Sequence, residues 1–282
     1  MQLIDTHVHL LHRGNLGYSW TEGIPALAEG DFTTADYFAL AGDAVSDALY
    51  MEMAVDGETG WMDEARLLCA MMRDGTERLS GVVASCRPER AEGFAAWVED
   101  CTAMGVNGFR RVLHEEPDDL STTETYRANV RRIGAAGLPY ELCYNDRQLG
   151  IARDLALACP DMPLILNHCG VPRIADGAFN SWRKDLAALA EVPHVLCKMS
   201  GVTAYCAPGT DHAAAIAPYI DTVLECFGPA RMVWGSDWPV VNLGAGLPDW
   251  IAISRQILGR LSPDEARLIA RDTATEVYGL SR

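Results

Sequence analysis

Short apolar runs alternate along the chain with longer segments whose apolar residues recur every three or four positions. Apolar runs without polar alternation, such as 79–84 and 163–166, are typical of parallel strands buried on both faces. We therefore predict strands at 2–7, 47–54, 79–85, 106–112, 139–143, 163–168, 194–200 and 231–236. The longer segments predict helices at 61–73, 90–104, 122–136, 147–159, 180–190, 211–227 and 248–258, with a closing helix over 262–277 that begins at a capping box.

Eight strands alternating with helices, without a Pro/Gly/Ser-rich linker, predict an α/β protein with one (β/α)8 barrel over residues 1–282. An open doubly wound sheet is less well supported. Its phosphate-binding Gly-x-Gly-x-x-Gly does not follow the first strand, where His7 and His9 stand instead. The segment 10–38 is too long for an ordinary connection, so we expect a substrate-covering loop after the first strand.

Composition narrows the class of protein. A hydrophobic fraction of 49% supports a full core, and a net charge of −16 disfavours nucleic acid and anionic membranes as partners. No apolar stretch approaches a membrane span, and Asp5 and His7 come too early for a signal peptide, so we expect a cytoplasmic protein with a small-molecule substrate. Nine cysteines without Cys-x-x-Cys spacing indicate reduced, buried thiols.

The first strand ends in two histidines one residue apart. Strand side chains alternate between faces, so His7 and His9 point the same way while Val8 packs opposite. Two adjacent imidazoles can bind a cation or polarise a carbonyl group. Near the far end of the chain, Asp237 follows the last strand, and no helix is expected before about Leu247 that it could cap. These side chains are therefore candidates for chemistry.

Other predicted strands also end in polar side chains. The fourth offers Arg110 and Arg111, the fifth Glu141, the sixth His168 and the seventh Lys198. Active sites of such barrels lie at the carboxyl ends of the strands, where these groups converge. Buried charges are costly unless they are paired or used. His168 could instead be a hydrogen-bonded core histidine, and Lys198 could pair with a neighbouring acid and only stabilise the barrel. Glu141 could be a metal ligand or only the partner of Arg110 or Lys198.

Several further side chains are weaker candidates. His114, His194 and His212 fall in loops or before helices and are interpreted as bystanders, while His12 stays open because it is close to the first strand. Cys169 follows His168 directly, and adjacent strand residues face opposite sides, which disfavours a thiol nucleophile at this position.

Five motifs together resemble the amidohydrolase superfamily, in its amidohydrolase 2 branch. They are Ile4-Asp5-Thr6-His7-Val8-His9, Gly108-Phe109-Arg110, Asn167-His168-Cys169-Gly170-Val171-Pro172, Cys197-Lys198-Met199-Ser200-Gly201 and Gly235-Ser236-Asp237-Trp238-Pro239-Val240, in the family's order from end to end. The runs Gly108 to Asp118 and Pro139-Tyr140-Glu141-Leu142 are most similar to the sugar-lactonase group, which includes hydrolases of aldonolactones and of a pyrone dicarboxylate lactone. This resemblance implies a (β/α)8 barrel with Asp237 as general base.

The resemblance also implies a metal content. Two-metal members of the superfamily bridge their ions with a carboxylated lysine, where this chain has Arg110. We therefore expect at most one divalent ion, Zn²⁺ or Mn²⁺, held by His7, His9 or Glu141, and Asp237. Catalysis without a metal stays an alternative.

Lactone hydrolysis requires an activated water and positive charge near the carbonyl oxygen. Asp237 would take the proton from water, while His7, His9 and His168, directly or through a metal, would stabilise the oxyanion and protonate the leaving hydroxyl.

Substrate binding would use a second group of side chains. Arg110 and Lys198 would hold a carboxylate or hydroxyls of the substrate, Arg110 by a planar two-point contact. Trp20 and Trp238 would stack on the sugar or pack in the core. A metal-dependent decarboxylase of the same superfamily is the alternative enzyme, and a non-catalytic sugar-binding barrel is the alternative outside catalysis.

Overall fold

Eight parallel strands form one sheet in which each strand pairs with the next along the chain. The structure is a computed structural model and describes residues 1–280, so the last two residues of the predicted domain lie outside the described part. The strands are β1 (Leu3–Val8), β2 (Val45–Met51), β3 (Gly81–Ser85), β4 (Gly108–Val112), β5 (Tyr140–Cys143), β6 (Leu164–Leu166), β7 (Val195–Met199) and β8 (Met232–Trp234).

β8 returns to β1 and completes the barrel. The backbone N–H of Asp237 donates to the carbonyl of His7 over 2.9 Å, and the N–H of His9 donates to the carbonyl of Trp238 over 2.7 Å. The Thr6 hydroxyl adds a 2.8 Å bond to the carbonyl of Trp234. The predicted single (β/α)8 barrel is confirmed. Its closure brings the histidines at the end of β1 close to Asp237 after β8.

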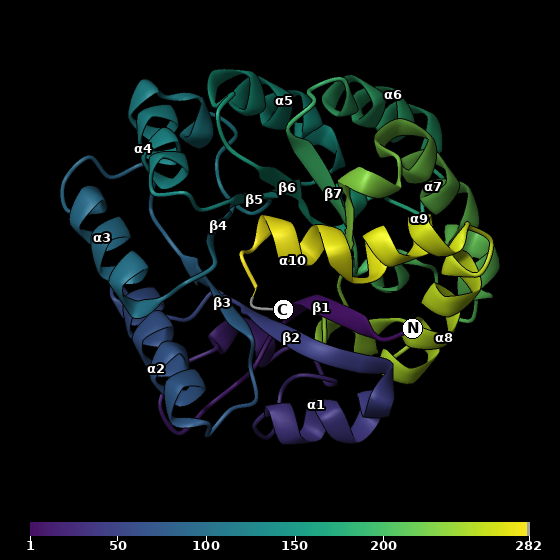
Figure 1. The fold of residues 1–282 in the computed structure, drawn as a ribbon, viewed down its shortest axis with the longest axis horizontal. Helices are drawn as coiled ribbons and strands as arrows, with labels where there is room; N and C mark the ends of the chain where they lie inside the picture. Colours follow the sequence, from purple (N-terminus) through teal and green to yellow (C-terminus); the bar gives the residue numbers. More distant parts are fainter. Residues whose placement is uncertain (281–282) are drawn as a thin grey trace.

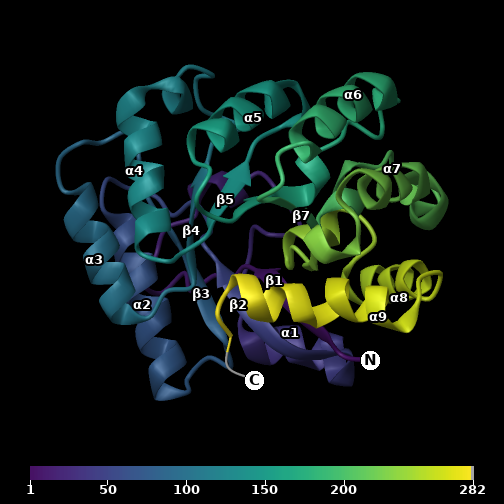
Figure 2. The ribbon, with the colours of Figure 1, turned by 45° about the horizontal axis from the view of Figure 1, so that its top comes forward.

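The helices form a ring around the sheet (Figures 1 and 2). They are α1 (Thr34–Ala41), α2 (Gly60–Asp74), α3 (Phe94–Met104), α4 (Glu124–Ala135), α5 (Leu149–Ala158), α6 (Phe179–Ala190), α7 (His212–Phe227) and α8 (Leu247–Leu258), followed by α9 (Pro263–Arg267), a π-helical turn (Leu268–Asp272) and α10 (Thr273–Val277). Trp182 on α6 and Trp250 on α8 are fully buried against the strands. This packing makes the larger part of the hydrophobic core.

The barrel interior is closed at its amino end by α10, which crosses that end in Figure 1. Ala274 and Tyr278 complete a second core cluster with inward-facing side chains of the strands, namely Ile4, Leu49, Met51, Val83, Ile165 and Val233. The side-chain amide of Asn107, just before β4, donates to the Tyr278 carbonyl over 2.9 Å. Apolar side chains fill the amino end of the barrel interior. The polar side chains therefore gather at its carboxyl end.

The segment after β1 differs from the predicted loop over 10–38. Helix α1 begins at Thr34 because Thr33 and Asp36 form a reciprocal capping box, a signal that the sequence interpretation missed. The connection therefore ends at Thr33. Within it, the backbones of Leu11 and Phe32 pair antiparallel.

This segment lies over the carboxyl ends of β1 and β2. The Asp56 carboxylate accepts hydrogen bonds from the backbone and the hydroxyl of Ser19, each over 2.7 Å. The Trp20 indole donates to the Met53 carbonyl over 3.1 Å. We name residues 10–33 the cover segment.

Seven of the nine cysteines are buried, in agreement with the prediction, while Cys206 and Cys226 are half-buried. Among residues 1–280, no helix has the length and apolar character needed to cross a membrane.

Candidate active site

His7 and His9 enter the mouth of the barrel side by side, as the strand pattern predicts. Their Nε2 atoms are 3.2 Å apart. The Nδ1 atom of His9 lies 2.9 Å from the Met51 carbonyl oxygen, which can only accept, so Nδ1 donates this hydrogen bond. The Nε2 atom of His9 faces Oδ1 of Asp237 at 3.3 Å. His9 therefore links the end of the second strand, through Met51, to the carboxylate after the eighth strand.

Asp237 stands three residues beyond the end of β8 and is only 3% exposed. Its φ of +63° is rare for a residue with a side chain, and such backbone strain is often kept at functional sites. Burial by itself raises the pKa of Asp237. The neighbouring His168, the hydrogen bond with His9 and the nearby Arg110 outweigh burial and hold the pKa below its ordinary value. Asp237 is therefore a carboxylate at neutral pH.

His168 follows the short strand β6 instead of ending a strand over 163–168. Its φ is +50°, which turns the chain sharply and directs the ring toward Asp237. The His168 Nδ1 atom lies 2.9 Å from the Ser200 hydroxyl oxygen and 3.9 Å from Oδ2 of Asp237. Burial lowers the pKa of His168 to about 4, with Asp237 opposing and Arg110 and Lys198 adding to the effect. The ring is therefore neutral at neutral pH.

Gly201 keeps these two side chains together. A Cβ atom at this position would lie 2.6 Å from Nδ1 of His168 and 2.7 Å from Oδ2 of Asp237, distances that real Cβ contacts do not show. Its φ of +66° also favours glycine. The Lys198-Met199-Ser200-Gly201 motif thus supplies both a hydrogen-bonding partner and free space for the His168 ring.

His7, His168 and Asp237 can hold one metal ion. Each offers one ligand atom, and these atoms lie within 4.8 Å of one another. Burial, followed by the charges of Lys198 and other neighbours, lowers the pKa of His7 well below its ordinary value, so this ring is neutral. Neutral imidazoles with one carboxylate are ligands that suit Zn²⁺, and the space kept by Gly201 adjoins two of them. The donor set therefore fits one divalent ion.

Glu141 does not belong to this group. Its carboxylate lies 3.0 Å from Nζ of Lys198, and both side chains are fully buried. Glu141 also accepts hydrogen bonds from Asn167 and from the Tyr278 hydroxyl, while Lys198 donates to the Thr6 carbonyl over 3.0 Å. These contacts favour the alternative in which Glu141 is the partner of Lys198. The prediction that Lys198 contacts substrate is not supported, because the ammonium group is enclosed within the barrel.

Arg110 makes its two-point contact with the protein and not with a free site. Its Nε atom donates to Oε1 of Glu52 over 2.6 Å, and Nη2 donates to the carbonyl of the same residue. Nη1 lies 3.2 Å from Nε2 of His7. The sequence interpretation missed Glu52, although a carboxylate between Met51 and Met53, at the end of an apolar strand, resembles the pattern of the other strand ends.

The two candidate tryptophans differ. Trp238 is 1% exposed and packs edge-on against Phe32 and Tyr37, with ring centroids 5.4 and 5.6 Å away. These contacts favour the alternative in which Trp238 packs in the core, because a buried ring cannot stack on a sugar. Trp20 is 40% exposed on the cover segment, and its role as a stacking residue stays a prediction.

The remaining histidines lie outside the cluster. The Nε2 atom of His12 lies 3.2 Å from Oε1 of Glu77, a contact that connects the cover segment to the turn before β3. The others occupy a loop after β4, the turn before β7 and the first turn of α7, and they are His114, His194 and His212.

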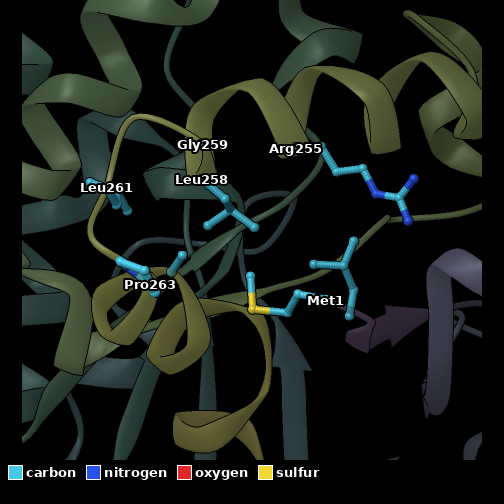
Figure 3. A pocket seen from close by; sticks show the side chains of 8 residues that line it. Met1, Arg255, Leu258, Gly259, Leu261 and Pro263 are labelled. Atoms are coloured by element: carbon cyan, nitrogen blue, oxygen red, sulfur yellow. The ribbon is translucent and has the colours of Figure 1, made fainter.

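A hollow of about 390 Å³ lies elsewhere on the molecule, between Met1, the end of α8 and the start of α9 (Figure 3). It is lined mainly by apolar side chains and by Arg255. Leu3, at the first residue of β1, belongs to this lining, whereas His7 and His9 stand at the other end of that strand. The hollow is therefore separate from the candidate active site.

Two histidines at the end of the first strand, a third after the sixth and an aspartate after the eighth thus gather at the mouth of a (β/α)8 barrel. The chain belongs to the amidohydrolase family, whose model matches residues 4–280. It is 30% identical to an L-fucono-1,5-lactonase from Burkholderia multivorans over 98% of this chain and 96% of the relative.

Solved structures agree with this assignment. An amidohydrolase from Burkholderia multivorans with bound zinc superposes with a TM-score of 0.88 and 27% identity, covering all of both chains. A probable 2-pyrone-4,6-dicarboxylic acid hydrolase from Acinetobacter baumannii has a TM-score of 0.80 at 17% identity, over 99% of this chain and all of the other, and shows the shared fold.

Proposed function

We propose that this protein opens the lactone ring of a sugar acid by attack of water, with Asp237 as the general base. The observation that carries the proposal is the buried, ionised Asp237 carboxylate between His9 and His168, at 3.3 and 3.9 Å. Support for the substrate class comes from the lactonase that this chain resembles over nearly its whole length.

The residues divide the reaction between them. Asp237 accepts a proton from the attacking water as the new C–O bond forms at the lactone carbonyl. The ring C–O bond then breaks, and Asp237 returns the proton to the leaving ring oxygen, which gives the open hydroxy acid. Nη1 of Arg110, beside His7, faces the negative charge that develops on the carbonyl oxygen. His168, held by Ser200, keeps the carboxylate of Asp237 oriented.

A metal ion fits the same mechanism. Bound to His7, His168 and Asp237, a divalent ion such as zinc would polarise the lactone carbonyl and acidify the attacking water. Asp237 has two oxygens that face different partners, Oδ1 toward His9 and Oδ2 toward His168, so one can bind the ion while the other accepts the proton.

The ion pairs of Arg110 and Lys198 change the charge expected of the substrate. Two unpaired strand-end cations would call for an anionic substrate, but Arg110 is paired with Glu52 and Lys198 with Glu141. The reason for expecting a free carboxylate on the lactone is therefore removed. A neutral polyhydroxylated aldonolactone fits this site better than a dicarboxylate.

The test is a proton-release assay with purified protein on a panel of five- and six-membered aldonolactones and aldarolactones, since each turnover releases one proton. We expect hydrolysis of aldonolactones to exceed that of aldarolactones, simple esters and amides. Silence across the lactones with carbon dioxide released from an aromatic or unsaturated acid would establish the decarboxylase instead. Lactone binding without turnover, unchanged in Asp237→Asn, would indicate a binding protein.

A further inference from the structure

Glu52 holds Arg110 at two points. It follows the last residue of β2 and is 1% exposed. Its Oε1 accepts from Nε of Arg110 over 2.6 Å, and its backbone carbonyl accepts from Nη2. The guanidinium is planar and rigid, so a grip on these two nitrogens fixes the direction of the third. That third nitrogen, Nη1, lies 3.2 Å from Nε2 of His7.

Glu52 is itself held in place. Its Oε2 accepts from the backbone N–H of Ala54 over 3.0 Å. The neighbouring carboxyl of Glu64 binds the chain on either side of Glu52, through the Tyr50 hydroxyl and the Met53 N–H, over 2.5 and 2.8 Å. The Glu52 carboxylate that binds Arg110 therefore belongs to a segment fixed by several hydrogen bonds.

The next residue of β4 provides a natural comparison. Arg111 faces away from the barrel interior and pairs with Glu89 at 3.0 Å and Glu116 at 2.9 Å. Both arginines have carboxylate partners, but only the pairing of Arg110 aims a guanidinium nitrogen at the histidine cluster. A buried charge pair often stabilises a fold no better than apolar residues of the same size would. Stability alone therefore gives no reason for Glu52 and Arg110 at this place.

We infer that Glu52 is a positioning residue of the reaction, which holds the Arg110 guanidinium so that Nη1 meets the charge developing on the substrate carbonyl oxygen. This inference rests on the proposed lactone hydrolysis, in which Arg110 touches the reacting group and Glu52 acts through it. The contact is specific in direction, because only Nη1 is left free of Glu52.

The first experiment compares Glu52→Gln with Glu89→Gln, the matched change at Arg111. Steady-state kinetics are measured on the best lactone substrate, with melting temperature and circular dichroism as fold controls. We expect Glu52→Gln to lower kcat by about a hundredfold with KM changed less than about threefold, the effect of a misdirected oxyanion donor. Glu52→Asp, which retains the charge, should recover part of kcat, and Glu89→Gln should stay within about twofold of the wild type.

The second experiment removes both partners, because Glu52→Gln alone leaves a buried unpaired guanidinium and could unfold. In the double variant Glu52→Gln/Arg110→Met both charges are gone, and its melting temperature should return toward that of the wild type. If Glu52 acts through Arg110, kcat of the double variant equals that of Arg110→Met alone. Millimolar guanidinium ion should restore activity to Arg110→Ala but not to Arg110→Ala/Glu52→Gln.

These measurements distinguish a failure of the proposed lactone hydrolysis from a failure of the proposed role of Glu52. A wild-type protein that hydrolyses no lactone overturns the proposed function and this role with it. A wild-type protein that is active, with Glu52→Gln as active as Glu89→Gln, overturns only the role of Glu52. Losses in kcat that multiply in the double variant do the same, because they show that the two residues act independently.

Discussion

The Nε2 atom of His9 lies 3.3 Å from Oδ1 of Asp237, although the two residues come from opposite ends of the chain. Barrel closure makes this contact, since the backbones of His9 and Trp238 are hydrogen-bonded over 2.7 Å. The polar residues after the first and last strands therefore lie in one site. Local unfolding between β1 and β8 would separate Asp237, the candidate base, from His9.

Asp237→Asn should lower turnover by at least about a hundredfold, because the amide cannot accept the proton of water. The side chain is isosteric, so the melting temperature should change little. Proton release on the best lactone measures the effect. Near-normal turnover in a folded variant would remove Asp237 from the base role.

Gly201→Ala should abolish most activity because the new Cβ would press on His168 and Asp237, at 2.6 and 2.7 Å. Gly209→Ala is the matched control: its φ is also positive, at +77°, but a Cβ added there would meet no atom within 4 Å. Both variants should lose about 1–2 kcal/mol from backbone strain, measured by urea unfolding. Equal activity in the two variants would show that the crowding at Gly201 does not matter to catalysis.

Metal analysis should find at most one zinc or manganese ion per chain after growth with added metal. His168→Ala should lower the content, because His168 belongs to the ligand cluster with His7 and Asp237. Glu141→Gln should leave the content unchanged, since this carboxylate binds Lys198. Two tightly bound ions, or loss of metal in Glu141→Gln, would contradict this ligand set.

Lys198→Met should destabilise the protein by about 3–5 kcal/mol, because it leaves Glu141 as a buried charge without its partner. The double variant Lys198→Met/Glu141→Leu should recover a large part of that loss. Urea unfolding measures both, and the double variant should keep a KM near that of the wild type. A large rise in KM at unchanged stability would return Lys198 to substrate binding.

Glu64 should contribute a component of stability that falls as the pH rises from about 5 to about 8. Burial, with the charge of Glu52 adding to it, raises the pKa of Glu64 to about 8, from an ordinary value of 4.5. Between these values the folded state holds a proton that the unfolded state releases, so this contribution is complete below about pH 4.5 and is lost as the pH passes 8. The slope reaches about 1.4 kcal/mol per pH unit.

Glu64→Gln retains the neutral shape, so it should lack this component of the pH dependence. Free energies of unfolding for variant and wild type, compared between pH 5.5 and 8.5, isolate the component because the other groups are shared. Parallel curves for the two proteins would show that Glu64 is ionised in the folded state.

Local sequence pattern was sufficient for the architecture and for the histidines and the aspartate of the candidate centre, but not for Glu52 or for the pairing of Glu141. Short and mostly apolar runs, alternating with helical patterns, predicted all eight strands, and the spacing of His7 and His9 predicted that they face the same way. These features depend on the period of the backbone and on strand direction, which neighbouring residues determine. Helix α1 was missed because its capping box, Thr33 to Asp36, lies inside a segment assigned by length alone.

The sequence by itself determined that this chain is a barrel with histidines and an aspartate at its mouth, because those properties follow from patterns within single strands. Only the tertiary structure decided which charged side chains are paired within the protein and which can contact a substrate. The partner of Arg110, Glu52, follows the end of β2, and the Tyr278 hydroxyl, which lies beyond the last helix, donates to Glu141. A strand pattern shows which face a side chain takes but not its depth in the barrel, so the enclosure of Lys198 and of Trp238 depended on packing between distant segments.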